Sequence, residues 1–156
     1  MAILIRGKTV CQLCGQVIAA KDDVAMFAAF ISNELDPLRA FDDGAFHESC
    51  FSRHPLAAEA RRRFEEYLEQ TRRRKCAVCR AEFIDPSDFV QVGHLSDSPS
   101  DPLHPFNYLC FHRSHLHAWP NRERLYRELS ARVSSGKLRS SGYGILLAAL
   151  SAPEKP

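Results

Sequence analysis

A pattern of cysteine and histidine that occurs twice is the feature of this 156-residue chain that most constrains its fold. Cys-x-x-Cys is followed downstream by His-x-x-Cys in the first copy and by His-x-x-His in the second. A shift of 65 positions (76 − 11) superposes the two copies without a gap. It aligns Cys11 with Cys76, Cys14 with Cys79, Asp36-Pro37-Leu38 with Asp101-Pro102-Leu103, Phe46-His47 with Phe111-His112, Cys50 with His115 and Pro55 with Pro120. We therefore interpret the chain as a tandem duplication.

The duplication predicts three segments. We expect a first repeat over residues 5–70, a second over 71–135, and a tail over 136–156 that holds a short apolar helix. A repeat of roughly 65 residues builds a hydrophobic core of only marginal stability. Bound metal would add stability, because the unfolded chain has no preformed site and binding energy becomes folding energy.

The repeated side chains are zinc ligands by type and by spacing. Structural zinc takes four sulfur or nitrogen ligands in a closed tetrahedron. The sequence therefore predicts two zinc ions and no other cofactor. The expected ligands are Cys11, Cys14, His47 and Cys50 at the first site, and Cys76, Cys79, His112 and His115 at the second.

The repeat also separates ligands from neighbouring residues that resemble them. Cys110 aligns with Ala45, which cannot bind metal, so we interpret Cys110 as a small buried apolar residue. Replacement of His112 or His115 by Cys110 in the second ligand set stays an open alternative.

No segment of the sequence indicates export or a membrane. The apolar run Ala2–Ile5 is too short for a signal peptide, and no stretch approaches the roughly 18 apolar residues of a membrane span. We therefore expect a cytoplasmic protein, in which a disulfide framework is disfavoured. A thioredoxin-type pair would explain one Cys-x-x-Cys motif but not two with histidines downstream.

Local sequence signals predict a mixed α+β arrangement in each repeat. After the Cys-x-x-Cys knuckle we expect a strand over Val24–Ile31, a turn at Asp36-Pro37 and a short return strand over Leu38–Phe41. A helix should begin near His47, because positions i and i+3 lie on one helix face and would present His47 and Cys50 to one ion.

A knuckle, a hairpin and a helix that completes the metal site resemble the treble-clef class of zinc fingers. The first repeat is also similar to the first zinc module of LIM domains, with a longer gap before His47. "CFHRSH" (110–115) resembles the core of RING-H2 fingers, although the closing Cys-x-x-Cys of a RING is absent. This last resemblance implies a ubiquitin-ligase-type adaptor as one alternative.

The second repeat additionally resembles an HNH endonuclease, on the residues "CAVC", "VGHL" and "FNYLCFHRSH". The resemblance implies that His94 acts as general base, that Asn107 precedes the helix, and that His115 or His117 holds a catalytic metal ion. The repeat register, however, assigns His115 to zinc. We therefore expect a binding module rather than an enzyme, with an HNH-like nuclease as the enzymatic alternative.

The segment 55–75 is predicted to be an amphipathic helix with a basic face. The stretch from Arg53 to Lys75, which begins just before this segment, carries eight Lys/Arg and four Glu, an excess of 8 − 4 = +4. We expect a protein partner, with nucleic acid as the second choice. Nucleic acid would be contacted through Arg61, Arg62, Arg63, Arg72, Arg73 and Arg74.

Overall fold

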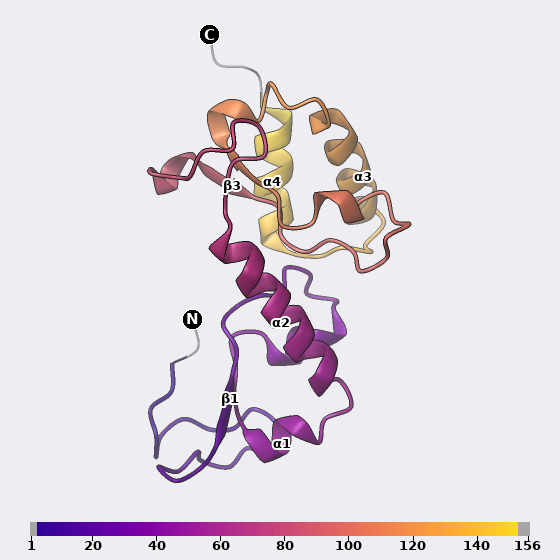
Figure 1. Cartoon of the computed structure of the whole chain (residues 1–156). Helices are drawn as coiled ribbons and strands as arrows, with labels where there is room; N and C mark the ends of the chain where they lie inside the picture. Colours follow the sequence, from indigo (N-terminus) through magenta and orange to yellow (C-terminus); the bar gives the residue numbers. More distant parts are fainter. Residues whose placement is uncertain (1–2, 153–156) are drawn as a thin grey trace. The chain divides into compact units, whose positions relative to one another are not determined.

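The chain forms two compact units (Figure 1). The computed structural model describes residues 3–152. The first unit contains the described residues up to Ile31 and Asp36–Glu69, and the second contains Ser32–Leu35 and the chain from Gln70 on. The expected segments 5–70, 71–135 and 136–156 refer to the repeat in the sequence and stay a prediction.

Each unit has one antiparallel β-hairpin, and the two hairpins are 65 residues apart. In the first unit β1 (Val24–Met26) pairs with β2 (Ala45–His47), and in the second β3 (Phe89–Gln91) pairs with β4 (Cys110–His112). In both, the first residue of one strand lies opposite the last residue of its partner. With the helices, these hairpins confirm the α+β class.

The strands differ from those that the sequence indicated. The strand expected over Val24–Ile31 ends at Met26, and the return strand expected over Leu38–Phe41 is wrong. Residues Pro37–Phe41 form a 3-10 helix, because the Asp36 carboxylate accepts the Leu38 N–H at 2.8 Å and proline suits the first turn. The return strand is instead β2, directly before the expected helix.

Four α-helices lie in the described part of the chain. They are α1 (Glu48–Ser52), α2 (Ala57–Arg72), α3 (Arg122–Ser134) and α4 (Ser141–Ser151). The helices expected near His47, within 55–75 and in the tail are therefore confirmed. None of these helices is long and apolar enough to span a membrane, among the residues that could be searched.

The core of the first unit is built mainly from phenylalanine. Phe27, Phe41, Phe46 and Phe51 are almost fully buried, and the Phe27 and Phe51 ring centroids are 4.9 Å apart. Tilted and edge-to-face ring pairs of this kind fill space without a long aliphatic core. Met26, the last residue of β1, is 37% exposed and lies outside this core.

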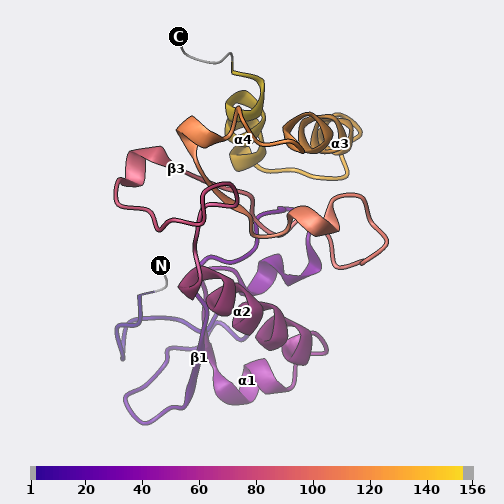
Figure 2. The same cartoon turned by 45° about the horizontal axis from the view of Figure 1, so that its top comes forward.

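The core of the second unit is mainly aliphatic. Leu125 and Leu129 of α3 are fully buried, and α4 packs beside α3 through residues such as Leu150 (Figure 2). The single tryptophan, Trp119, packs on Phe111 at 4.6 Å between ring centroids. The apolar tail helix thus completes this core.

Candidate metal centres

Each unit brings four Cys and His side chains together. Ligand atoms of Cys11, Cys14, His47 and Cys50 lie within 4.8 Å of one another, and so do those of Cys76, Cys79, His112 and His115. The structure therefore assembles all eight expected ligands into two groups, each of which could hold a metal ion.

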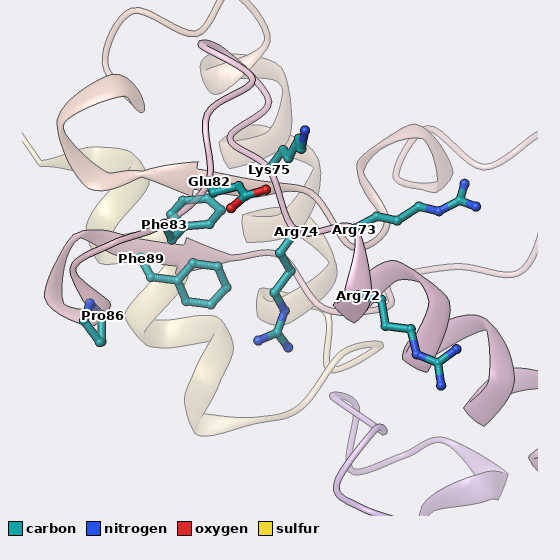
Figure 3. Close-up of a pocket in the computed structure, with 8 residues that line it drawn as sticks. All are labelled: Arg72, Arg73, Arg74, Lys75, Glu82, Phe83, Pro86 and Phe89. Carbon is teal, nitrogen blue, oxygen red and sulfur yellow. The ribbon is translucent and has the colours of Figure 1, made fainter.

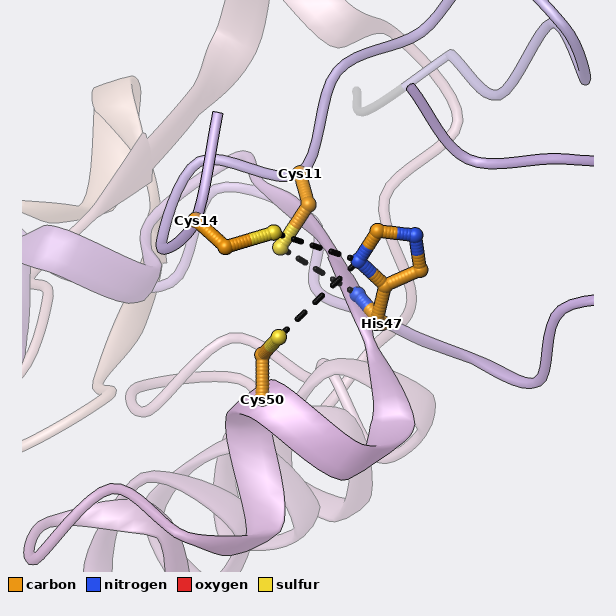
Figure 4. A group of neighbouring side chains, drawn as sticks. All are labelled: Cys11, Cys14, His47 and Cys50. Atoms are coloured by element: carbon orange, nitrogen blue, oxygen red, sulfur yellow. Dashed lines mark hydrogen bonds between the residues drawn. The ribbon is translucent and has the colours of Figure 1, made fainter. Parts of the chain in front are cut away.

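The first group converges from three local elements (Figure 4). Cys11 and Cys14 lie in the knuckle, His47 ends β2, and Cys50 lies in the short helix α1. The His47 Nδ1 is 3.4 Å from the Cys14 Sγ and 3.9 Å from the Cys50 Sγ. Zinc bound at about 2.0–2.3 Å keeps tetrahedral ligands roughly 3.3–3.8 Å apart, so the first distance lies within this range and the second lies about 0.1 Å beyond it.

The second group has the same construction. The Cys79 Sγ is 3.4 Å from the His112 Nδ1, and the Cys76 Sγ is 3.6 Å from the His115 Nδ1. His112 ends β4, and His115 lies in a 3-10 helix, Arg113–His115, at the position of α1. This donor set also suits zinc, with two sulfur and two nitrogen ligands in place of three and one.

Backbone N–H groups make both knuckles suitable for thiolates. The His47 N–H points at the Cys11 Sγ at 3.4 Å, and the His112 N–H points at the Cys76 Sγ at the same distance. Burial raises the pKa of these two cysteines, but such N–H groups outweigh it and lower each pKa to about 6. Thiolate, the form that binds metal, is thereby favoured at neutral pH.

The knuckle turn itself repeats, with one costly difference. The N–H of Gly15 donates to the Cys11 carbonyl, and the N–H of Arg80 donates to the Cys76 carbonyl. Both residues have positive φ, 72° at Gly15 and 64° at Arg80. Glycine adopts this conformation freely and arginine does not, so the second knuckle is held against a local backbone preference.

An aspartate outside the ligand set orients His47. The Asp22 Oδ2 lies 3.2 Å from the His47 Nε2, while the Nδ1 of the same ring faces the cysteines. The Ala19 N–H fixes this carboxylate at 2.7 Å, and the Arg6 guanidinium bonds three carbonyls of the same turn. Such carboxylate–histidine contacts set the tautomer and raise the basicity of a metal ligand.

The second group has no such aspartate. At the position of Asp22 stands Ser87, and no carboxylate of the described residues lies within ion-pair distance of His112. The His112 ring instead packs on Phe83 at 4.6 Å and on His115 at 5.0 Å. Neither Asp22 nor Phe83 belongs to a ligand motif, so the sequence gives no sign of either role.

Cys110 lies outside the second group. Its side chain is buried, and its Sγ points at the Tyr108 carbonyl at 3.5 Å. Burial raises the pKa of the Cys110 thiol to about 11, so the protonated, apolar form dominates. This placement agrees with the buried-residue interpretation of Cys110.

Asn107, expected in the HNH-like alternative, has a structural counterpart in the first unit. Its Oδ1 accepts the N–H groups of Leu95 and Ser96 at 2.8 and 3.2 Å. In the first unit the Asp42 Oδ1 accepts the N–H groups of the equivalent residues 30 and 31 at 2.6 and 2.8 Å. The side chain of Asn107 thus closes a loop that both units contain.

The histidines of that alternative lie in different environments. His94 is 8% exposed, and its Nε2 is 3.4 Å from Asp97. His115 lies among the zinc ligands. The His117 Nδ1 is buried, without a hydrogen-bond partner among the described residues.

The first three arginines expected to bind nucleic acid are paired within the first unit. Arg61 contacts Glu48 at 2.8 Å, and Arg62 contacts Glu59 at 2.6 Å. Arg63 is 2% exposed, with its guanidinium 3.4 Å from Asp36. Their charges are largely neutralised by neighbouring carboxylates.

The second three arginines lie at a cavity of about 460 Å³ in the second unit (Figure 3). Residues 72–75 contribute three arginines and a lysine, and Phe83, Phe89 and Glu82 also line the cavity. The Arg74 guanidinium lies over the Phe89 ring at 5.3 Å from its centroid. Phe83 and Phe89 meet edge to face at 4.7 Å.

Comparison of the chain with protein-family models, with curated proteins and with solved structures found no match. The functional assignment therefore depends on the two Cys/His groups, whose composition and spacing are consistent with two zinc sites.

Proposed function

We propose that this protein is a binding module made of two treble-clef-like zinc fingers, in which both ions are structural. The observation that carries the proposal is that each group offers four Cys/His ligands from a single unit. Four protein ligands fill the tetrahedral shell of zinc and leave no position for water or substrate. A catalytic zinc site keeps such a position open.

The equivalence of the two units supports a duplicated finger. The Phe27 N–H donates to the Gly44 carbonyl in the first unit, and the Val92 N–H donates to the Leu109 carbonyl in the second. The knuckle turns and the loops closed by Asp42 and Asn107 also match at the 65-residue shift. Such agreement follows if one finger was copied.

A protein partner is supported by apolar side chains on the first unit. Val10 and Val17 form an isolated antiparallel bridge and are 48% and 51% exposed. Paired residues of an antiparallel bridge point to the same face. The equivalent positions of the second unit are Lys75 and Glu82, so this apolar pair belongs to the first unit.

Nuclease assays on the zinc-loaded full chain test binding against catalysis. We expect two zinc ions per chain by elemental analysis and no cleavage of single- or double-stranded DNA with magnesium, manganese or nickel. Cleavage that His94→Ala abolishes, in a protein that keeps both zinc ions, would replace this proposal with the HNH-like one. One zinc ion or none in carefully purified protein would refute the two-finger structure itself.

A further inference from the structure

We propose that the second unit binds single-stranded nucleic acid at the cavity beside residues 72–75. Arg72, Arg74 and Lys75 would contact phosphates, and Phe83 would contact a base. The inference rests on the proposed role as a binding module and names the ligand class of one site. Of the arginines that the sequence suggested for nucleic-acid binding, the proposal keeps only those at the end of α2.

The two units differ in how the segment before the knuckle covers one side chain. Phe83 corresponds to Ile18 of the first unit, which is fully buried. Ile18 is covered there by the segment before the knuckle: the Gly7 N–H donates to the Ile18 carbonyl at 2.8 Å, and the Ile18 N–H donates to the Thr9 carbonyl at 2.9 Å. The residues equivalent to 7–9 are 72–74, the last residue of α2 and the two that follow. Phe83 consequently stays partly exposed.

The charge at the cavity suits a polyanion. Arg72 and Lys75 are exposed, Arg74 is partly buried, and Glu82 is the single carboxylate among the lining residues. Figure 3 shows these basic side chains fanning out from one short segment, with Arg74 reaching toward Phe89 and Arg72 extending in another direction. Cationic side chains that point in different directions can contact several phosphates along a nucleic-acid backbone better than they can surround one small anion.

The aromatic side chains that line the cavity favour single-stranded nucleic acid over other polyanions. Unpaired bases have free faces that pack on aromatic side chains, whereas the bases of a duplex are stacked on one another. An acidic peptide would use the cations but has no need of the Phe83 ring. Cations and an accessible ring side by side therefore point to phosphate and base together.

The first unit offers no second copy of this surface. Gly7, Thr9 and Val10 stand where Arg72, Arg74 and Lys75 stand in the second unit. The α2 arginines of the first unit, such as Arg62, are paired with carboxylates instead. One site per chain is thus expected.

Fluorescence anisotropy of a labelled 12-nucleotide single strand with the zinc-loaded full chain tests the inference. We expect saturable binding at 50 mM salt that weakens at 200 mM, with log K falling against log[salt] at a slope of about −2 for three phosphate contacts. The double variant Arg72→Ala/Lys75→Ala should weaken binding at least tenfold and reduce that slope. Phe83→Leu should weaken binding and leave the slope unchanged.

Arg62→Ala is the matched control, because Arg62 is also an α2 arginine but contacts Glu59 and Glu66. It should bind the oligonucleotide as the wild type does. Equal loss in this control, no binding at 50 mM salt, or tighter binding of polyglutamate or of a duplex would overturn the inference. Zinc content measured on the same samples separates the two proposals: two ions without oligonucleotide binding refute only this one.

Discussion

His47 and His112 differ in what contacts the part of the imidazole ring that faces away from the cysteines. His47 has Asp22 at 3.2 Å, in a turn that Arg6 fastens through three carbonyls, whereas His112 has aromatic neighbours. A carboxylate on the outer nitrogen of a metal-bound imidazole strengthens the metal bond. The first group also has one more thiolate. Two groups of similar shape should therefore hold zinc with different strength.

Asp22→Asn should lower the zinc affinity of the first site by roughly tenfold, within the range typical of substitutions at residues that hydrogen-bond to a metal ligand. Asparagine keeps an oxygen for the Ala19 N–H but loses the charge that orients His47. Competition with a chromophoric chelator measures the effect, and cobalt loading identifies the site by the different spectra of three-thiolate and two-thiolate centres. Asp23→Asn is the control, since Asp23 lines a surface pocket together with Asp22 and His47, whereas the carboxylate at 3.2 Å from the His47 ring is that of Asp22. Equal loss in both variants would contradict the orienting role of Asp22.

His115→Ala should remove about one zinc ion per chain, and Cys110→Ser should remove none. His115 faces the Cys76 sulfur, while the Cys110 thiol is buried and points at a carbonyl. Elemental analysis of the two variants, with circular dichroism to verify folding, decides the matter. The reverse pattern would show that Cys110 is the ligand.

At the scale of the elements, a carboxylate in each unit connects two of them. It lies in the loop before the second strand of the hairpin and contacts the helix that follows the metal group. Asp36 caps its 3-10 turn through the Leu38 N–H and contacts Arg63 of α2. Asp101 accepts the Leu103 N–H in the turn before the 3-10 helix His104–Phe106 and contacts Arg132 of α3 at 2.9 Å. One carboxylate in each unit thus joins a turn to a helix.

Arg132→Met should reduce the free energy of unfolding of the second unit by about 1.5–3 kcal/mol, the range for hydrogen bonds to charged groups. Burial raises the pKa of Asp101, but the Leu103 N–H and Arg132 outweigh this effect and lower the pKa overall. The carboxylate is therefore ionised at neutral pH, and in the variant it loses its cationic partner. Urea unfolding of zinc-loaded protein measures the change. Arg127→Met, on the same helix but 74% exposed at its side chain, should change stability by less than about 0.5 kcal/mol. Equal effects of the two substitutions would contradict the assigned role.

At the scale of the whole molecule, each unit has its own small core beside its own Cys/His group. The two cores share no buried residue, so we expect each unit to depend on its own ion for stability. Trp119 reports on the second unit alone, because it is the single tryptophan and packs on Phe106 and Phe111.

Graded addition of a strong zinc chelator should unfold the second unit before the first. Its site has two thiolates, no orienting carboxylate and an arginine in the left-handed conformation at the knuckle. The Trp119 emission should shift to the red at chelator concentrations that leave part of the helical circular dichroism intact, and excess chelator should remove the rest. Coincident transitions, or retained structure without zinc, would contradict this order.

The eight Cys/His positions, the 65-residue equivalence and the long helices could all be predicted without the structure. These depend on short-range rules: two cysteines share one knuckle, His47 and Cys50 are three positions apart, and apolar residues of α2 and α3 recur at helical spacing. The strands were harder to place, because the Asp36-Pro37 signal begins a 3-10 helix as readily as it ends a strand.

The neighbours of those ligands become known only from the folded structure. Only folding brings Asp22 to His47, buries Arg63 against Asp36 and leaves Phe83 open beside Arg74, since these partners are far apart in the sequence or lie on different elements. No local pattern distinguishes an arginine that is neutralised by a carboxylate from one that faces a cavity. Charge and burial depend on the neighbours that packing supplies, and the sequence does not state which neighbours those are.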